Sequence, residues 1–164
     1  MKRVFVILTA VLGLVACAGD NIGPGVPDSI LMGGVPGAQS LHLGANRLDA
    51  TQAHLSVVAE VAGSPKTRLT ALTIAISGKR LECGTEMLAT LTEPHWLSAA
   101  TAGEKRYVII AGRDAGESYI AVFTIEGGWI SERLVAHGEF RHQIWNRTIY
   151  HDDIIQHPER YKDM

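Results

Sequence analysis

Apolar and polar residues alternate along much of the chain from about residue 53 onward, which is typical of half-buried β-strands. The run 53–61 places apolar side chains at every second position: Leu55, Val57, Ala59 and Val61. A second apolar run, 69–77, follows the turn-forming residues 63–67. The two runs therefore predict a β-hairpin. A helix is the weaker alternative, because β-branched residues such as Val57 and Val58 disfavour it.

The segment 85–91 is the best candidate for a helix in this part of the chain. Thr85 stands at the position of an N-cap, Glu86 supplies an acid in the first turn, and Pro94 follows as a stop. A helix of about two turns is not stable alone. We therefore expect it to pack against the sheet.

The clearest pattern is a second hairpin, formed by strands at 119–126 and 129–140 around the dipeptide Gly127-Gly128. Counted outward from this two-residue loop, a regular ladder pairs Ile125 with Ile130, Thr124 with Ser131, Phe123 with Glu132, Val122 with Arg133, Ala121 with Leu134 and Tyr119 with Ala136. One face of the hairpin is then largely apolar. A register shift of one residue would scatter that apolar set.

Together with strands at 107–111 and 144–150, these elements predict a mainly β domain. We expect an antiparallel meander or hairpin sheet, arranged as a sandwich or half-open barrel, with one short helix. The chain of 164 residues has room for one such domain, which we place at 46–164. The preceding segment 17–45 is rich in glycine and proline, which disfavour helix and strand. It predicts a flexible tether.

The segment 1–16 has the pattern of a secretory signal peptide. Lys2 and Arg3 precede an apolar run that ends near Cys17, and the uncharged stretch 4–19 is shorter than the roughly 20 residues needed to span a bilayer. A buried helix of the domain is the weaker alternative, because a positive pair followed by a short apolar run is typical of an export signal.

The four residues Leu14, Val15, Ala16 and Cys17 follow the order leucine, β-branched residue, small residue, cysteine. This stretch resembles the lipobox of bacterial lipoprotein precursors, and the resemblance covers the leader only. It implies that signal peptidase II recognises residues 14–16 and cuts before Cys17, which carries a diacylglyceryl group and, on its amino group, an acyl chain such as palmitate. Two or three acyl chains make a stable anchor. A secreted protein with an ordinary Cys17 is the alternative.

The location and partners follow from this resemblance and from the charge. Ala18, rather than aspartate, follows the cysteine; in a Gram-negative cell, the resemblance then implies an outer membrane protein facing the periplasm. The formal net charge of −2, without a basic stripe, gives no footprint for nucleic acid. We expect contact with the membrane through the lipid anchor, another envelope protein as partner, and no cofactor.

Cys83 is the only cysteine besides Cys17. If Cys17 carries lipid, Cys83 has no partner within the chain. It is then either a buried thiol packed as a small hydrophobic residue or one half of an intermolecular disulfide. A catalytic thiol is disfavoured because no neighbouring residue in the sequence is arranged to activate it.

Histidine and carboxylate residues near the carboxyl end form the main chemical candidate. His137 and Glu139 alternate on one strand, and His151 and Asp153 follow the next strand. These are residue types that zinc prefers, so they predict a possible metal site. The simpler interpretation is a solvated polar surface, because the sequence has no H-E-x-x-H or C-x-x-C motif.

Trp129, directly after the Gly127-Gly128 turn, is the candidate for a partner-binding surface. Its alternative is a place in the core. The leading hypothesis for function is therefore a lipid-anchored envelope protein that acts as a binding or structural module without catalysis. The alternative is a metal-binding protein or metal-dependent hydrolase that uses the histidine cluster.

Overall fold

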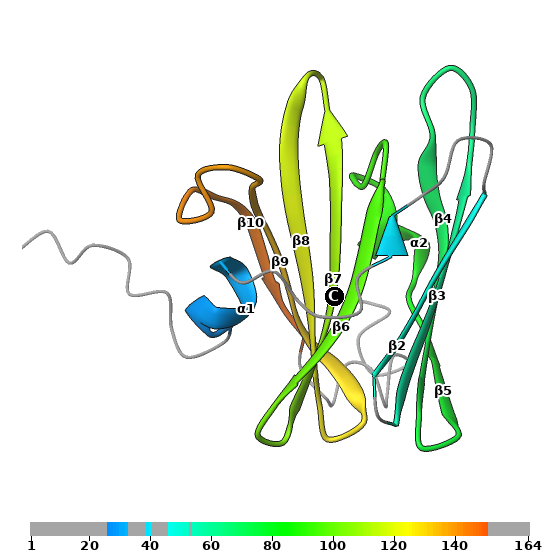
Figure 1. The fold of residues 1–164 in the computed structure, drawn as a ribbon, viewed down its shortest axis with the longest axis vertical. Coiled ribbons are helices and arrows are strands. Elements are labelled where there is room, and N and C mark those ends of the chain that lie inside the picture. The colour runs from blue at the N-terminus through cyan, green and yellow to red at the C-terminus, as the bar shows by residue number, and fades with distance from the viewer. Residues whose placement is uncertain (1–25, 33–38, 41–45, 53, 151–164) are drawn as a thin grey trace, which may run out of the picture.

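The computed structural model describes residues 26–32, 39–40, 46–52 and 54–150. They form two antiparallel β-sheets packed face to face, with two short helices (Figure 1). The predicted mainly β, antiparallel fold is confirmed. The strands are β1 (Gln39–Ser40), β2 (Arg47–Gln52), β3 (Leu55–Ala62), β4 (Arg68–Ile76), β5 (Lys79–Glu82), β6 (Trp96–Ala102), β7 (Lys105–Asp114), β8 (Glu117–Glu126), β9 (Trp129–His137) and β10 (Ile144–Ile149).

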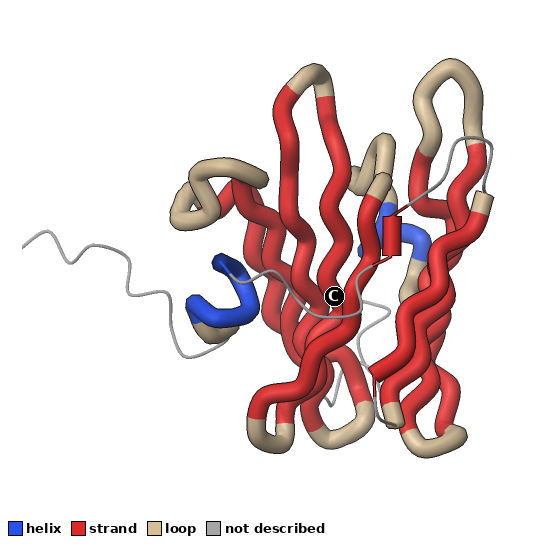
Figure 2. The backbone as a smooth tube through the Cα atoms, viewed as in Figure 1, coloured by secondary structure: helices blue, strands red, loops and turns tan. Residues whose placement is uncertain are grey.

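Strands adjacent in sequence pair in space throughout both sheets, apart from β1, which pairs with β6 at the edge of the larger sheet (Figure 2). The smaller sheet has the order β2-β3-β4-β5, and the larger has the order β1-β6-β7-β8-β9-β10. The predicted hairpins at 53–77 and 119–140 correspond to β3–β4 and β8–β9, although β9 ends at His137 rather than at residue 140. Gly127 and Gly128 both have positive φ, 61° and 86°, as the tight turn between β8 and β9 requires.

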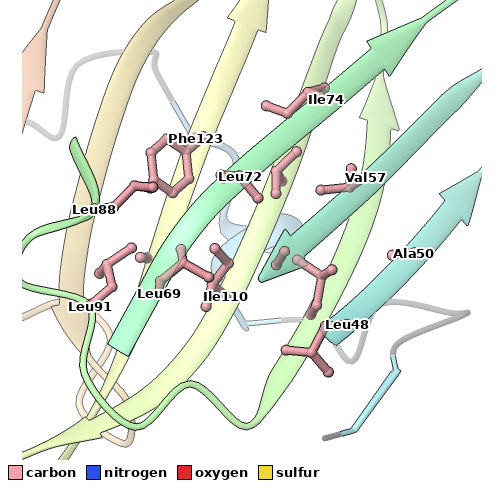
Figure 3. Packing of buried hydrophobic residues seen from close by; sticks show 14 of the residues in the cluster. Leu48, Ala50, Val57, Leu69, Leu72, Ile74, Leu88, Leu91, Ile110 and Phe123 are labelled. Atoms are coloured by element: carbon pink, nitrogen blue, oxygen red, sulfur yellow. The ribbon is translucent and has the colours of Figure 1, made fainter. Parts of the chain in front are cut away.

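The main core lies between the two sheets. Alternate residues of β3 point inward, as the sequence pattern predicts, and they meet side chains from β7 and β8. Figure 3 shows part of this core at close range and labels Leu48, Ala50, Val57, Leu69, Leu72, Ile74, Leu88, Leu91, Ile110 and Phe123. Burial of this apolar layer is what holds the two sheets together.

The larger sheet is also buried on its outer face. A second apolar cluster there includes Ile109, Val122 and Leu134, and it is covered by helix α1 (Asp28–Met32) through Ile30 and Leu31. This helix corrects the prediction that glycine and proline exclude helical structure before residue 46. It persists because two of its side chains are buried against the sheet.

Strand β1 also lies within the predicted tether, where it pairs with β6. The rest of the segment 17–45, apart from residues 26–32, 39 and 40, lies outside the described residues. So does the predicted signal peptide at 1–16, with Leu14, Val15 and Ala16. The boundaries of both segments stay predictions.

Helix α2 (Thr85–Leu88) is shorter than the predicted helix at 85–91, and its N-cap is Gly84, without a side-chain cap, rather than Thr85. The early end has a tertiary cause. The amide of Leu91 donates to the carbonyl oxygen of Leu88 in a tight turn, and the amide of Leu69 in β4 donates to the carbonyl oxygen of Leu91. Leu91 therefore reaches the core after the helix has ended.

The predicted register between β8 and β9 holds only next to the turn. Ile125 pairs with Ile130 as predicted, but a β-bulge then adds Ser131 to β9, and every later pair shifts by one residue. Arg133 consequently pairs with Phe123 instead of Val122, so it points toward the inner face of the sheet. The prediction failed because β8 is buried on both faces, and an apolar pattern of that kind does not favour one register.

The two sides of the sandwich are built differently. On one side β2 packs beside β6, so the sheets approach each other closely. On the other side β5 and β10 are the outer strands, and neither pairs with a further strand among the residues described. The segment 83–95, which contains α2, crosses from β5 of the smaller sheet to β6 of the larger one. We call the side of β9 and β10 the open side.

Candidate binding site at the open side of the sandwich

A cavity of about 150 Å³ lies at the open side of the sandwich. Its wall comes from five parts of the chain: the crossing segment after α2, the end of β7, and strands β8, β9 and β10. The lining residues are Thr90, Asp114, Tyr119, Val135, Trp145 and Asn146. They combine apolar surface with a few polar groups, as small-molecule sites do.

Arg133 lies beside this cavity on the inner face of β9. It is only 5% exposed. Its Nη1 donates to the side-chain oxygen of Asn146 at 2.9 Å, and its Nη2 donates to the hydroxyl of Thr90 at 2.6 Å. Both acceptors line the cavity, so hydrogen bonds join the guanidinium to two residues of the cavity wall.

The charge of Arg133 has no acidic partner in the described part of the chain. None of the ion pairs there includes it, and its Nε is buried without a hydrogen bond. Burial lowers the pKa of the guanidinium below its ordinary value. Arginine nevertheless remains cationic at neutral pH. Among the residues that the structure describes, the positive charge of Arg133 inside the sandwich is therefore uncompensated.

Tyr119 forms a rigid wall of the cavity. Its side chain passes over Gly112 of β7, where an added Cβ would lie 2.3 Å from the phenolic oxygen. The hydroxyl donates to the carbonyl oxygen of Thr92 at 2.9 Å. Burial raises the pKa of Tyr119 well above its ordinary value, so the ring stays neutral at physiological pH.

Trp145 closes the cavity from β10. It is the extra residue of a second β-bulge, between the pairs Ile144–Ala136 and Asn146–Val135, and it is 42% exposed. Its ring meets that of His137 edge-on, with 5.6 Å between ring centroids. Phe140 lies on the same imidazole, with 5.0 Å between centroids. The three rings brace the loop between β9 and β10.

The predicted metal site is only partly described. The Nδ1 atom of His137 accepts hydrogen bonds from the backbone amides of Glu139 and Phe140, at 3.1 and 3.0 Å, so this nitrogen caps the loop. His151 and Asp153 lie outside the described residues. Within the described ranges, no three His, Cys, Asp or Glu side chains are grouped to hold a metal ion. A site that needs the residues beyond 150 stays a prediction.

Trp129 is half-buried beside the β8–β9 turn, and its Nε1 lies 3.2 Å from where a Cβ on Gly127 would stand. The ring is therefore folded over the turn. Its role as a partner surface stays a prediction. The large apolar side chains that are exposed in the described part of the chain lie elsewhere, at Phe140, Trp145 and Ile149.

Cys83 is half-buried and packs against the main core. Burial, reinforced by the negative charge of Glu86, raises the pKa of its thiol to about 12. Thiolate is the nucleophilic form, so this cysteine is poorly suited to catalysis near neutral pH. Cys17 lies outside the described residues.

A larger cavity, of about 220 Å³, lies on the far side of Tyr119 and is bordered by Arg141. In contrast to Arg133, this arginine donates to the backbone carbonyl oxygens of Gly138 and Leu31 and so ties the β9–β10 loop to α1. It has a structural task. The uncompensated arginine belongs to the smaller cavity.

Sequence reasoning missed both Arg133 and Trp145. The predicted ladder pairs Arg133 with Val122 rather than with Phe123, and the sequence does not single out Trp145. A signal for Arg133 was present, since it is a charged residue within the apolar strand 129–137. Its direction could not be read from the sequence, because the bulge at Ser131 sets it.

No protein-family model, curated protein or solved structure matches the chain. Among the described residues, neither helix has the length and apolar character needed to cross a membrane. Function is therefore argued from the chemistry of the open side.

Proposed function

We propose that the protein is a lipid-anchored module of the bacterial cell envelope that binds another envelope component without catalysing a reaction. The observation that carries this proposal is the exposure of large apolar side chains along one edge of the larger sheet. Phe140, Trp145 and Ile149 are 60%, 42% and 58% exposed, and they are the large hydrophobic residues that stand out on the described surface. All three lie on β10 or the loop before it.

The location of this group favours a protein partner. β10 is an outer strand of the larger sheet, and an outer strand presents backbone hydrogen-bonding groups to a partner. Exposed apolar side chains beside such an edge are typical of an interaction surface. We name Phe140, Trp145 and Ile149 the β10 surface.

The ionisable groups near the site support binding rather than catalysis. Burial raises the pKa of both Tyr119 and Cys83, so neither readily gives up its proton near neutral pH. A general base or nucleophile needs the opposite adjustment. The lipid anchor is proposed from the lipobox at 14–17, and it would hold the module at the outer membrane, facing the periplasm.

In-cell crosslinking tests the partner. A photo-crosslinking residue in place of Ile149 or Phe140 should give a discrete adduct with another envelope protein, because both side chains are exposed at the β10 surface. The matched control is the same residue in place of Glu82, which is exposed on β5, the outer strand of the smaller sheet. Adducts of equal yield from all three positions, or from none, would refute the β10 surface.

The anchor has a separate test. Replacing Cys17 with alanine removes the thiol that the lipobox would lipidate. The variant should accumulate as an uncleaved precursor or appear in the soluble fraction. Membrane fractionation and mass spectrometry measure both outcomes. Processing and membrane retention equal to those of the wild type would exclude a lipid anchor at this cysteine.

A further inference from the structure

We infer that the cavity above Arg133 binds the carboxylate group of a small ligand and that the guanidinium is its counterion. The inference rests on the proposed binding role and specifies the ligand chemistry of the open side. Its starting point is the buried, uncompensated charge of Arg133.

The donors of Arg133 are incompletely used. A guanidinium carries five N–H donors. In the described structure Arg133 makes two hydrogen bonds, both to neutral oxygens, and its Nε makes none. Buried charges in proteins are normally paired. An arginine that is 5% exposed and lacks a described acidic partner is therefore prepared for an anion supplied from outside.

The position of the two acceptors indicates how an anion would reach the charge. Asn146 and Thr90 hold the two Nη atoms, and both residues also line the cavity. A carboxylate that replaced these two acceptors would meet the fork of the guanidinium. Arginine binds a carboxylate through two parallel hydrogen bonds in that geometry.

The walls select a small organic anion with one negative charge. Val135, Tyr119 and the ring of Trp145 supply apolar surface for the body of the ligand, and the volume of about 150 Å³ limits its size. Asp114 stands at the same cavity and accepts a hydrogen bond from the hydroxyl of Thr92. Its negative charge disfavours phosphate, which carries more negative charge than a carboxylate.

Two β-bulges build this arrangement. The bulge at Ser131 turns Arg133 toward the inside, and the bulge at Trp145 places an aromatic ring at the cavity. Bulges often re-aim a side chain next to a functional site. A regular ladder would have placed Arg133 on the opposite face of β9.

Titration calorimetry on the full-length protein in detergent tests the inference. The ligands are acetate, propionate, phenylacetate and phenylalanine, with inorganic phosphate as the comparison anion. We expect at least one carboxylate to bind more tightly than phosphate. Arg133→Met should weaken that binding by about tenfold or more, because it removes the counterion.

Arg147→Met is the matched control. Arg147 lies on the outer face of β10, where its Nε donates to Glu132, so its loss should leave carboxylate binding unchanged. A wild-type protein that binds none of the four carboxylates would overturn the inference. So would an Arg133→Met protein that binds them as the wild type does.

Thermal unfolding separates a binding role from a structural one. Without ligand, Arg133→Met should melt at the same temperature as the wild type or higher, because a buried charge without a partner is replaced by an apolar side chain. A lower melting temperature, together with unchanged carboxylate binding in Asn146→Asp, would overturn the inference.

Asn146→Asp also covers the case in which Arg133→Met fails to fold. It places a permanent carboxylate where the Asn146 oxygen now lies 2.9 Å from Nη1. The variant should melt at a higher temperature and lose carboxylate binding.

Carboxylate binding with no adduct at the β10 surface would refute the envelope partner alone, whereas an adduct without carboxylate binding would refute this inference alone.

Discussion

The two sides of the sandwich differ in how regularly their strands pair and in what fills the space between the sheets. On the side where β2 packs beside β6, the pairs β2–β3 and β6–β7 run in continuous register, and buried apolar residues such as Leu48 and Leu97 fill the space between the sheets. At the open side, β8–β9 and β9–β10 each contain a bulge, and the inner face carries Arg133. The pair β3–β4 is also interrupted, between Glu60 and Val61, beside apolar core residues, so the inward-facing arginine rather than the bulges alone distinguishes the open side.

This contrast indicates where the fold serves stability and where it serves recognition. A regular, apolar interface gains free energy from burial alone. The open side instead accepts a buried cation, an exposed tryptophan and two bulges, none of which improves packing. Features that lower stability and are not compensated by better packing are expected at functional sites.

The largest expected effect concerns the core. Phe123 is fully buried between the sheets, so Phe123→Ala should lower the free energy of unfolding by about 3–5 kcal/mol, measured by urea denaturation. Phe140→Ala is the control at the exposed β10 surface, and its effect should stay within about 0.5 kcal/mol. Equal losses in the two variants would mean that the β10 surface is part of the core.

A smaller effect is expected at the boundary between the two sides. Gly112→Ala would place a Cβ 2.3 Å from the Tyr119 hydroxyl, which displaces the ring and breaks its bond to Thr92. We expect a loss of about 1–3 kcal/mol in urea denaturation. Tyr119→Phe, which removes only the hydroxyl, should cost about 1 kcal/mol. An unchanged free energy of unfolding in Gly112→Ala would show that the Tyr119 ring can move freely, and it would contradict the description of this ring as a rigid wall.

The smallest effect concerns alkaline pH. Burial raises the pKa of Cys83 to about 12, and the pKa values of Tyr119 and Tyr150 shift in the same direction. Between the unfolded and folded pKa values, the folded protein binds more protons than the unfolded chain. Stability is therefore complete below about pH 9 and falls as the pH rises above it.

For Cys83 the slope should be at most about 1.4 kcal/mol per pH unit above pH 9. The measurement is urea denaturation at several pH values between about 8 and 10.5, a window in which Cys83 is the first of these groups to titrate. Cys83→Ala should flatten the profile, because alanine does not ionise. An equally steep profile in this variant would assign the alkaline loss to other groups.

Much of the fold could be predicted because local patterns decided it. The strand pair β3–β4 followed from alternation in a sheet with one buried face, and the β8–β9 turn followed from Gly127-Gly128. The candidate site could not be predicted in the same way. Its residues come from five separate parts of the chain, and its central side chain points inward only because of a bulge.

Helix α1 shows the same limit. Its sequence, DSILM, has no strong helical signal and lies in a segment rich in glycine and proline, yet Ile30 and Leu31 are buried against the outer face of the larger sheet. The expectation of a flexible tether was reasonable locally. The helical conformation of these five residues was not expected, because it depends on a surface that other strands create.

The sequence by itself determined the β class, the positions of the main strands and the tight turns, because alternation and glycine act over a few residues. It also carries the lipobox resemblance from which the membrane anchor is proposed. Tertiary structure alone decided the register beyond Ser131, the inward direction of Arg133 and the folding of α1. The physical reason is that both faces of the larger sheet are buried, so apolar residues suit either face, and only packing between distant segments selects one arrangement.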